Sequence, residues 1–150
     1  MKTERPIVSS RELNDRLHTS GLRFTAQRHE VLSVLLEKRD HPTAEEVFIR
    51  AKRRMPEISM ATVYNCLDAL VKCNLVRQVN LDRAATRYCP NMTEHSHFRC
   101  DACGRIYDIE LAARDLACNV PKGFQVSHSE ISLRGLCAGC ATDNSPQHRP

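Results

Sequence analysis

Residues 59–88 read SMATVYNCLDALVKCNLVRQVNLDRAATRY, and the spacing of their apolar side chains changes partway along. Up to about Cys73 the apolar side chains recur every three or four residues, which predicts a helix capped by Ser59. Leu75–Val79 and Ala85–Tyr88 are then predicted to be short strands joined by a turn. A helix followed directly by a small hairpin is the order of a winged helix-turn-helix.

Shorter helices are predicted before this segment. Ser10–Ser20 carries apolar side chains one turn apart, and Thr25 can cap a helix over Ala26–Lys38. The sequence Thr43-Ala-Glu-Glu46 has the form of a capping box, which predicts a third helix through about Arg54. Three or four short helices before a hairpin therefore predict a winged-helix domain.

The second half of the chain mixes strands with a short helix. His97–Asp101 and Arg105–Ile109 are predicted to pair as strands, and Leu111–Asn119 to form a helix. Gly123–Leu136 is predicted to be one long extended stretch. The fold class expected for the whole chain is α+β, with domains over residues 1–88 and 89–150.

The chain has 150 residues, and its net charge of +4 is unevenly placed. Residues 1–88 hold 16 Lys or Arg against 11 Asp or Glu, whereas residues 89–150 hold 6 against 7, which gives +5 and −1. A basic first half favours contact with nucleic acid. The alternative is an ordinary solvated surface.

Neither a secretory nor a membrane segment is predicted. The first ten residues are charged and lack an apolar run, and no stretch approaches the roughly 20 apolar residues that span a bilayer. Eight cysteines in such a chain favour metal ligands and reduced thiols over disulfides. The predicted compartment is the cytoplasm.

Two Cys-x-x-Cys pairs, Cys100 with Cys103 and Cys137 with Cys140, predict a zinc site. Four thiolates complete a tetrahedral site that is closed to water, so this zinc is expected to be structural rather than catalytic. A single pair would also suit a redox dithiol, and a zinc-stapled thiol redox protein therefore stays open as an alternative.

His95 and His97 alternate along a predicted strand, so both imidazoles are expected on one face, where they can chelate a second metal. Candidates for the remaining ligands are His41 at a helix break, Cys89 at the domain boundary and Asp108 on the paired strand. The alternatives are surface histidines, a helix-end histidine and a free buried thiol.

The start of the fourth helix is the candidate DNA reader, because helix-turn-helix proteins place this part of the second helix in the major groove. Ser59, Thr62 and Asn65 can hydrogen-bond phosphates or base edges, and Tyr64 can touch a thymine methyl group. Arg28 can grip a phosphate near another helix N-terminus. The alternatives are an ordinary amphipathic helix and an exposed arginine.

Six segments taken together resemble the ferric uptake regulator superfamily over nearly the whole chain. They are Gly21-Leu-Arg-Phe-Thr-Ala-Gln-Arg28, His41-Pro-Thr-Ala-Glu-Glu46, Ser59-Met-Ala-Thr-Val-Tyr-Asn65, His95-Ser-His97, Cys100-Asp-Ala-Cys-Gly104 and Cys137-Ala-Gly-Cys140.

The resemblance implies a homodimeric, metal-dependent transcriptional repressor, not an enzyme, that binds a palindromic DNA operator and controls zinc or iron uptake genes. It implies a DNA-binding domain over residues 1–88 and a metal-binding dimerisation domain over residues 89–150. The paired cysteines match the family's structural zinc ligands, and Tyr64 and Arg28 match its DNA-contacting positions. His41, His95, His97 and Asp108 match its regulatory metal site.

Cys89 stands where iron- and peroxide-sensing members carry an acid and where zinc sensors carry a cysteine, whereas His41 looks more like the iron and peroxide branches. A thiolate with imidazoles favours zinc as the regulatory metal, with ferrous iron or manganese as alternatives. A peroxide-sensing repressor that uses the same site is the alternative function.

Overall fold

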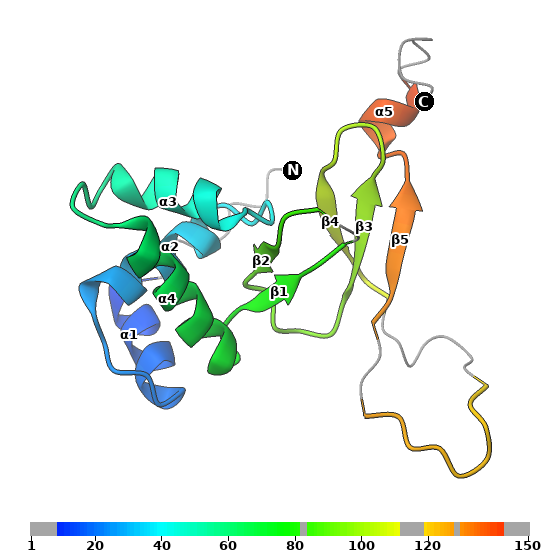
Figure 1. Ribbon diagram of the computed structural model, residues 1–150, viewed down its shortest axis with the longest axis horizontal. Coiled ribbons are helices and arrows are strands. Elements are labelled where there is room, and N and C mark those ends of the chain that lie inside the picture. Colours follow the sequence, from blue (N-terminus) through cyan, green and yellow to red (C-terminus); the bar gives the residue numbers. More distant parts are fainter. Residues whose placement is uncertain (1–8, 82–83, 112–118, 128–129, 143–150) are drawn as a thin grey trace. The chain divides into compact units, whose positions relative to one another are not determined.

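The computed structural model describes residues 9–81, 84–111, 119–127 and 130–142, and it divides into two compact units, Met1–Met92 and Thr93–Pro150. Helices and a two-stranded hairpin make up the first unit, and a three-stranded sheet with a short helix makes up the second (Figure 1). The predicted α+β class, an N-terminal winged helix followed by a small α/β unit, is confirmed.

The helices of the first unit are α1 (Ser10–Thr19), α2 (Ala26–Glu37), α3 (Ala44–Lys52) and α4 (Met60–Lys72). Each begins after a capping hydroxyl that accepts a backbone N–H, and three of these caps, Thr25, Thr43 and Ser59, were expected. In the predicted capping box Thr43 Oγ1 accepts from the Glu46 N–H while the Glu46 carboxylate accepts from the Thr43 N–H. Local side-chain chemistry therefore sets where these helices start.

One apolar core holds the four helices together. α1 contributes Leu13 and Leu17, and Val47 of α3 has no exposed surface. Full burial of each such side chain is worth roughly 1.5–3 kcal/mol. Most of the other members of the core lie on α2 and α4, which contribute Val31, Leu32, Val34, Leu35, Leu36, Val63, Cys66, Leu67 and Leu70.

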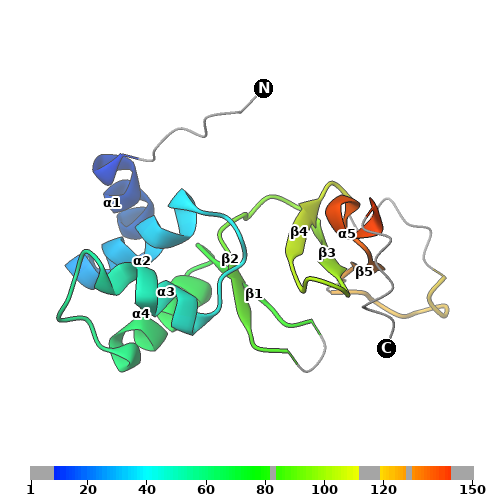
Figure 2. The same ribbon diagram turned by 90° about the horizontal axis from the view of Figure 1, so that it is seen from above.

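The wing consists of β1 (Arg77–Val79) and β2 (Arg87–Cys89), which pair antiparallel with Arg77 opposite Cys89 (Figure 2). Both strands are shorter than predicted at their start. Leu75 does not join the ladder because its N–H closes the end of α4 on the Leu70 carbonyl, after Asn74 has turned the chain at φ 57°.

The sheet of the second unit has the order β4-β3-β5, with β3 (Ser96–Cys100) in the centre. β4 (Ile106–Ile109) runs antiparallel to β3, as predicted, and β5 (Ser132–Gly135) runs parallel to it. α5 (Ala138–Thr142) follows β5 (Figure 1).

One prediction for this unit needs correction. Within the described residues of Gly123–Leu136 only β5 forms part of a ladder, and the stretch begins with a turn, in which Gly123 has φ 86° and the Phe124 N–H donates to the Pro121 carbonyl. Cys137 precedes α5, and Cys140 lies within it. The helix predicted over Leu111–Asn119 lies almost wholly outside the described residues.

Within the part of the chain that the structure describes, no helix is both long enough and apolar enough to cross a bilayer.

Candidate metal centres and nucleic-acid face

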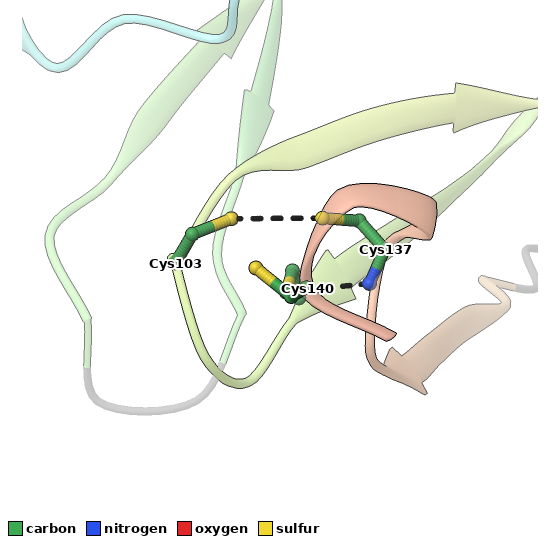
Figure 3. Close-up of side chains that lie close together, drawn as sticks. Cys103, Cys137 and Cys140 are labelled. Atoms are coloured by element: carbon green, nitrogen blue, oxygen red, sulfur yellow. Dashed lines mark hydrogen bonds between the residues drawn. The ribbon is translucent and has the colours of Figure 1, made fainter. Parts of the chain in front are cut away.

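The four cysteines of the two pairs converge in the second unit. Cys100 ends β3 and Cys103 lies in the turn to β4, while Cys137 and Cys140 belong to the segment that leads into and through α5. Their sulfur atoms all lie within 4.8 Å of one another. Figure 3 shows Cys103 facing Cys137, with Cys140 beside them.

This arrangement fits a zinc ion rather than a disulfide. A tetrahedral site with Zn–S bonds of about 2.3 Å requires sulfur atoms about 3.8 Å apart. Cys103 Sγ and Cys137 Sγ are 3.9 Å apart, far longer than the roughly 2.05 Å of an S–S bond. None of the seven described cysteines forms a disulfide. The centre would place no open position on the metal, which makes it structural.

The surrounding backbone favours thiolates, which are the form that binds metal. The N–H groups of Cys103 and Cys137 lower the pKa of Cys100 to about 6, and the Cys137 N–H lies 3.3 Å from the Cys100 sulfur. The N–H of Cys140 and the Tyr107 hydroxyl lower the pKa of Cys137. The pKa of Cys140 rises to about 12, because its proton is shared with the sulfur atoms of Cys137 and Cys100.

A second group of donor atoms gathers at the start of β3. His95 Nε2 and His97 Nε2 are 3.0 Å apart, and Asp108 Oδ1 lies 3.4 Å from both. The antiparallel register produces this meeting, because it places His97 directly opposite Asp108. The expectation that the two imidazoles share a face is confirmed, although β3 itself begins only at Ser96.

The ring of His95 is oriented by a backbone carbonyl. Its Nδ1 lies 2.7 Å from the carbonyl oxygen of Thr93, and a carbonyl can only accept, so Nδ1 carries the proton. In the neutral ring the lone pair is therefore on Nε2, the atom that faces His97 and Asp108. A carbonyl on the far nitrogen is the usual support for a metal-binding histidine.

The other two candidate ligands, His41 and Cys89, belong to the first unit. His41 lies between α2 and α3 with φ 55°, and Cys89 is the last residue of β2. A backbone hydrogen bond links the residues next to them, because the Tyr88 N–H donates to the Pro42 carbonyl at 3.0 Å. The ligand atoms of His41 and Cys89 lie within 4.8 Å of each other.

The predicted DNA-reading residues lie at the start of α4. Tyr64 is 42% exposed and Asn65 is exposed as well, so both can meet a partner. The Tyr64 hydroxyl donates to the Glu45 carboxylate of α3 at 3.2 Å. Ser59 and Thr62 are engaged in capping the helix, since the Ser59 hydroxyl accepts from the Thr62 N–H at 3.1 Å.

Arg28 lies in the first turn of α2, where its Nη1 donates to the Arg23 carbonyl at 2.8 Å. Other arginines of this unit are committed to carboxylates: Arg50 forms a bidentate pair with Asp40, and Arg54 does so with Glu37. Some of the positive charge of the first half is thus neutralised by ion pairs between residues in, or just after, α2 and α3.

Sequence reasoning missed three residues that support these sites. Tyr107 donates its hydroxyl to the Cys137 sulfur, Glu45 holds the Tyr64 hydroxyl, and Arg87 donates to the His41 carbonyl. The only signal for Tyr107 in the sequence is its position on the strand beside Asp108. No motif marks Glu45 or Arg87, because each acts across a long sequence separation.

Comparisons with known proteins agree on one family. The model of the ferric uptake regulator family matches residues 19–134. The peroxide operon regulator of Bacillus subtilis (strain 168) is 33% identical over 141 residues, which cover 89% of this chain and 97% of that protein.

Solved structures show the same fold. The Campylobacter jejuni peroxide stress regulator is 29% identical with a TM-score of 0.61, covering 87% of this chain and 97% of that one. The Helicobacter pylori ferric uptake regulator reaches a TM-score of 0.71 at 22% identity, covering 94% and 99%. A match this extensive sets aside the alternative of a thiol redox enzyme. The chain belongs to the ferric uptake regulator family of metal-responsive transcriptional repressors.

Proposed function

We propose that this protein is a cytoplasmic DNA-binding repressor whose regulatory metal is held by His41, Cys89, His95, His97 and Asp108. The observation that carries the proposal is the convergence of His95 Nε2, His97 Nε2 and Asp108 Oδ1 within 3.4 Å, with the Thr93 carbonyl fixing the tautomer of His95. Three donors this close together can supply part of a chelating set for one metal ion.

His41 and Cys89 are proposed to supply those ligands. Cys89 precedes His95 by only six residues, so the chain between them can span at most about 20 Å. Within the first unit His41 is tied to the same strand end as Cys89. The two half-sets therefore belong to different units but are joined by a short tether.

Zinc is the regulatory ion that this donor set favours. A thiolate with two or three imidazoles suits a soft, four-coordinate ion, whereas manganese prefers oxygen ligands. Ferrous iron and manganese remain alternatives because Asp108 adds an oxygen donor. This ion is distinct from the structural zinc proposed for Cys100, Cys103, Cys137 and Cys140.

The shared ligands offer a mechanism for repression. His41 and Cys89, when they bind the same ion as His95 and His97, fix the angle between the two units. In a two-fold homodimer that angle sets the spacing of the two α4 helices, and hence their fit to a palindromic operator. The start of α4 then faces base edges and phosphates, which it contacts through Ser59, Thr62, Tyr64 and Asn65. Arg28 binds a phosphate. Zinc or iron uptake genes are the proposed targets.

A second candidate, peroxide sensing, is favoured by the relatives. The regulator from Bacillus subtilis and the solved structure from Campylobacter jejuni are both peroxide regulators by name. In this version the same residues hold ferrous iron, and peroxide oxidises a ligand such as His95 or the Cys89 thiol, which releases the metal. Mass analysis after peroxide treatment of iron-loaded protein separates the two candidates, because only a peroxide sensor gains oxygen on a ligand residue and loses DNA binding.

Counting metal per chain tests the site itself. The purified protein is expected to bind two zinc ions per chain, and His97→Ala to bind one, since the four cysteines are untouched. His18→Ala, an exposed histidine on α1, is the matched control and should still bind two. Two tightly bound ions in His97→Ala would contradict the proposed ligand set.

A further inference from the structure

The main chain at His41 adopts a conformation that a non-glycine residue rarely keeps unaided. In the described part of the chain, only His41 and Asn74 among non-glycine residues have positive φ, at 55° and 57°. Asn74 follows α4, where a left-handed residue is a common helix ending. His41 ends no helix directly, so its left-handed backbone must be held by surrounding contacts.

Those contacts come from β2. The Arg87 guanidinium donates from Nη1 to the His41 carbonyl at 3.0 Å, and the next residue, Tyr88, donates its N–H to the Pro42 carbonyl at 3.0 Å. Thr43 forms an isolated antiparallel bridge with Arg87. Three consecutive loop residues are therefore fastened to two consecutive strand residues.

Arg87 is itself held from the other side. Its Nη1 lies 3.8 Å from Glu46 Oε2, and the same oxygen accepts the Thr43 N–H at 2.8 Å as part of the capping box. The Glu46 carboxylate thus links the start of α3 to the guanidinium. With 28% of its side chain exposed, Arg87 is partly shielded from water, which strengthens such charged hydrogen bonds.

Arg87 and Cys89 are two residues apart on β2, so their side chains share one face of the strand. We propose that Arg87 is a positioning residue, which locks the His41 main chain beside Cys89 so that the first unit presents both donors already oriented for the regulatory metal. This inference rests on the proposed function. A pre-oriented pair of ligands loses less conformational freedom when the metal binds, and this raises the affinity for the metal.

The test is a competition titration of Zn²⁺ against a chelator, with the full chain already holding its structural zinc. Arg87→Met is expected to weaken the regulatory zinc about 10-fold, because one charge-assisted hydrogen bond to the loop is lost. At saturating zinc its DNA affinity should return to that of the unsubstituted protein. A residue needed only for folding would instead lower DNA affinity at every zinc concentration, and that result would overturn the inference.

Two further variants keep the test decisive. Arg54→Met removes an arginine paired with Glu37 and Glu30 elsewhere in the unit and should leave zinc affinity unchanged. An equal loss in Arg54→Met would show general destabilisation and overturn the inference. If Arg87→Met does not fold, Glu46→Gln takes its place, because it keeps an acceptor for the Thr43 N–H but loses the charge facing Arg87. A lower zinc affinity in Glu46→Gln would support the inference, and an unchanged zinc affinity would overturn it.

His97→Ala distinguishes a failure of the proposed Arg87 role from a failure of the proposed regulatory metal site. If His97→Ala loses the regulatory zinc while Arg87→Met binds it like the unsubstituted protein, the site stands and Arg87 does not position it. If His97→Ala keeps both zinc ions, the proposed regulatory site itself is wrong, and the positioning role falls with it.

Discussion

Cys89 is the residue on which the choice of metal depends. The other candidate ligands are three histidines and Asp108, a set that many divalent ions accept. A thiolate adds a soft donor that binds zinc strongly and suits manganese poorly. Cys89 ends β2, on the strand face it shares with Arg87, so its position is fixed by the wing rather than by a loose linker.

Cys89→Asp changes a proposed direct ligand of the regulatory zinc. Loss of a residue that only supports a ligand lowers metal affinity roughly 10- to 100-fold, so we expect Cys89→Asp to lower zinc affinity at least that much. Activation by manganese or ferrous iron should improve relative to zinc. Chelator competition with each ion measures the ranking. Cys73→Asp, at the end of α4 and away from the candidate ligands, is the matched control. If Cys89→Asp left the order of affinities for the three ions unchanged, Cys89 would not determine the choice of metal.

At the residue scale, ligands carried by local motifs were predictable and their supports were not. Cys-x-x-Cys spacing and His-x-His alternation predicted which sulfur atoms and which imidazoles the structure brings together. The bond from Arg87 to His41 joins residues 46 positions apart, and Tyr107 meets Cys137 only through the fold. Such contacts depend on tertiary packing, which a single sequence does not encode in any local pattern.

The elements of the first unit were predictable because their signals are local. The capping hydroxyls of Thr25, Thr43 and Ser59 and the three-to-four-residue apolar spacing fix each helix within a turn. β5 was harder, because its parallel pairing with β3 is formed between segments more than 30 residues apart in the chain. α5 has five residues, too few to produce a readable apolar period.

The zinc proposed for the four cysteines would fasten the last elements of the second unit to its hairpin. Cys103→Ser should therefore lose about one zinc per chain and unfold β5 and α5 from β3, because structural zinc contributes roughly 10–16 kcal/mol of apparent binding free energy. Hydrogen exchange and zinc content measure both effects. Cys73→Ser carries the same substitution in the first unit and should retain its zinc. A stable, zinc-free second unit in Cys103→Ser would refute the structural role.

α4 is the element proposed to read DNA, and Tyr64 is its most testable residue. Tyr64→Ala should lower the preference for operator over random DNA by about 1 kcal/mol or more, because the ring proposed to contact bases is lost. Tyr64→Phe keeps the ring and removes only the bond to Glu45, so it should retain most of that preference. Competition binding with random DNA measures the ratio. Equal preference in Tyr64→Ala and the unsubstituted protein would place the reading surface elsewhere.

In the whole molecule, we propose that the two units share one regulatory ion. Each unit has its own sheet and its own set of donors, and the family places the chain among metal-responsive repressors. On this proposal the angle between the units is not fixed when the ion is absent, so only a fraction of dimers would match the operator. Shared ligands would raise that fraction and thereby lower the apparent dissociation constant for DNA.

The most direct test measures DNA affinity for the operator upstream of the protein's own gene, with one zinc per chain and then with the regulatory site filled. We expect filling the site to tighten DNA binding by roughly 10-fold or more, the size of a typical coupling free energy. His97→Ala, which keeps the four-cysteine zinc, should bind weakly under both conditions. Equal DNA affinity with and without the second ion, or full metal-dependent tightening in His97→Ala, would contradict the account.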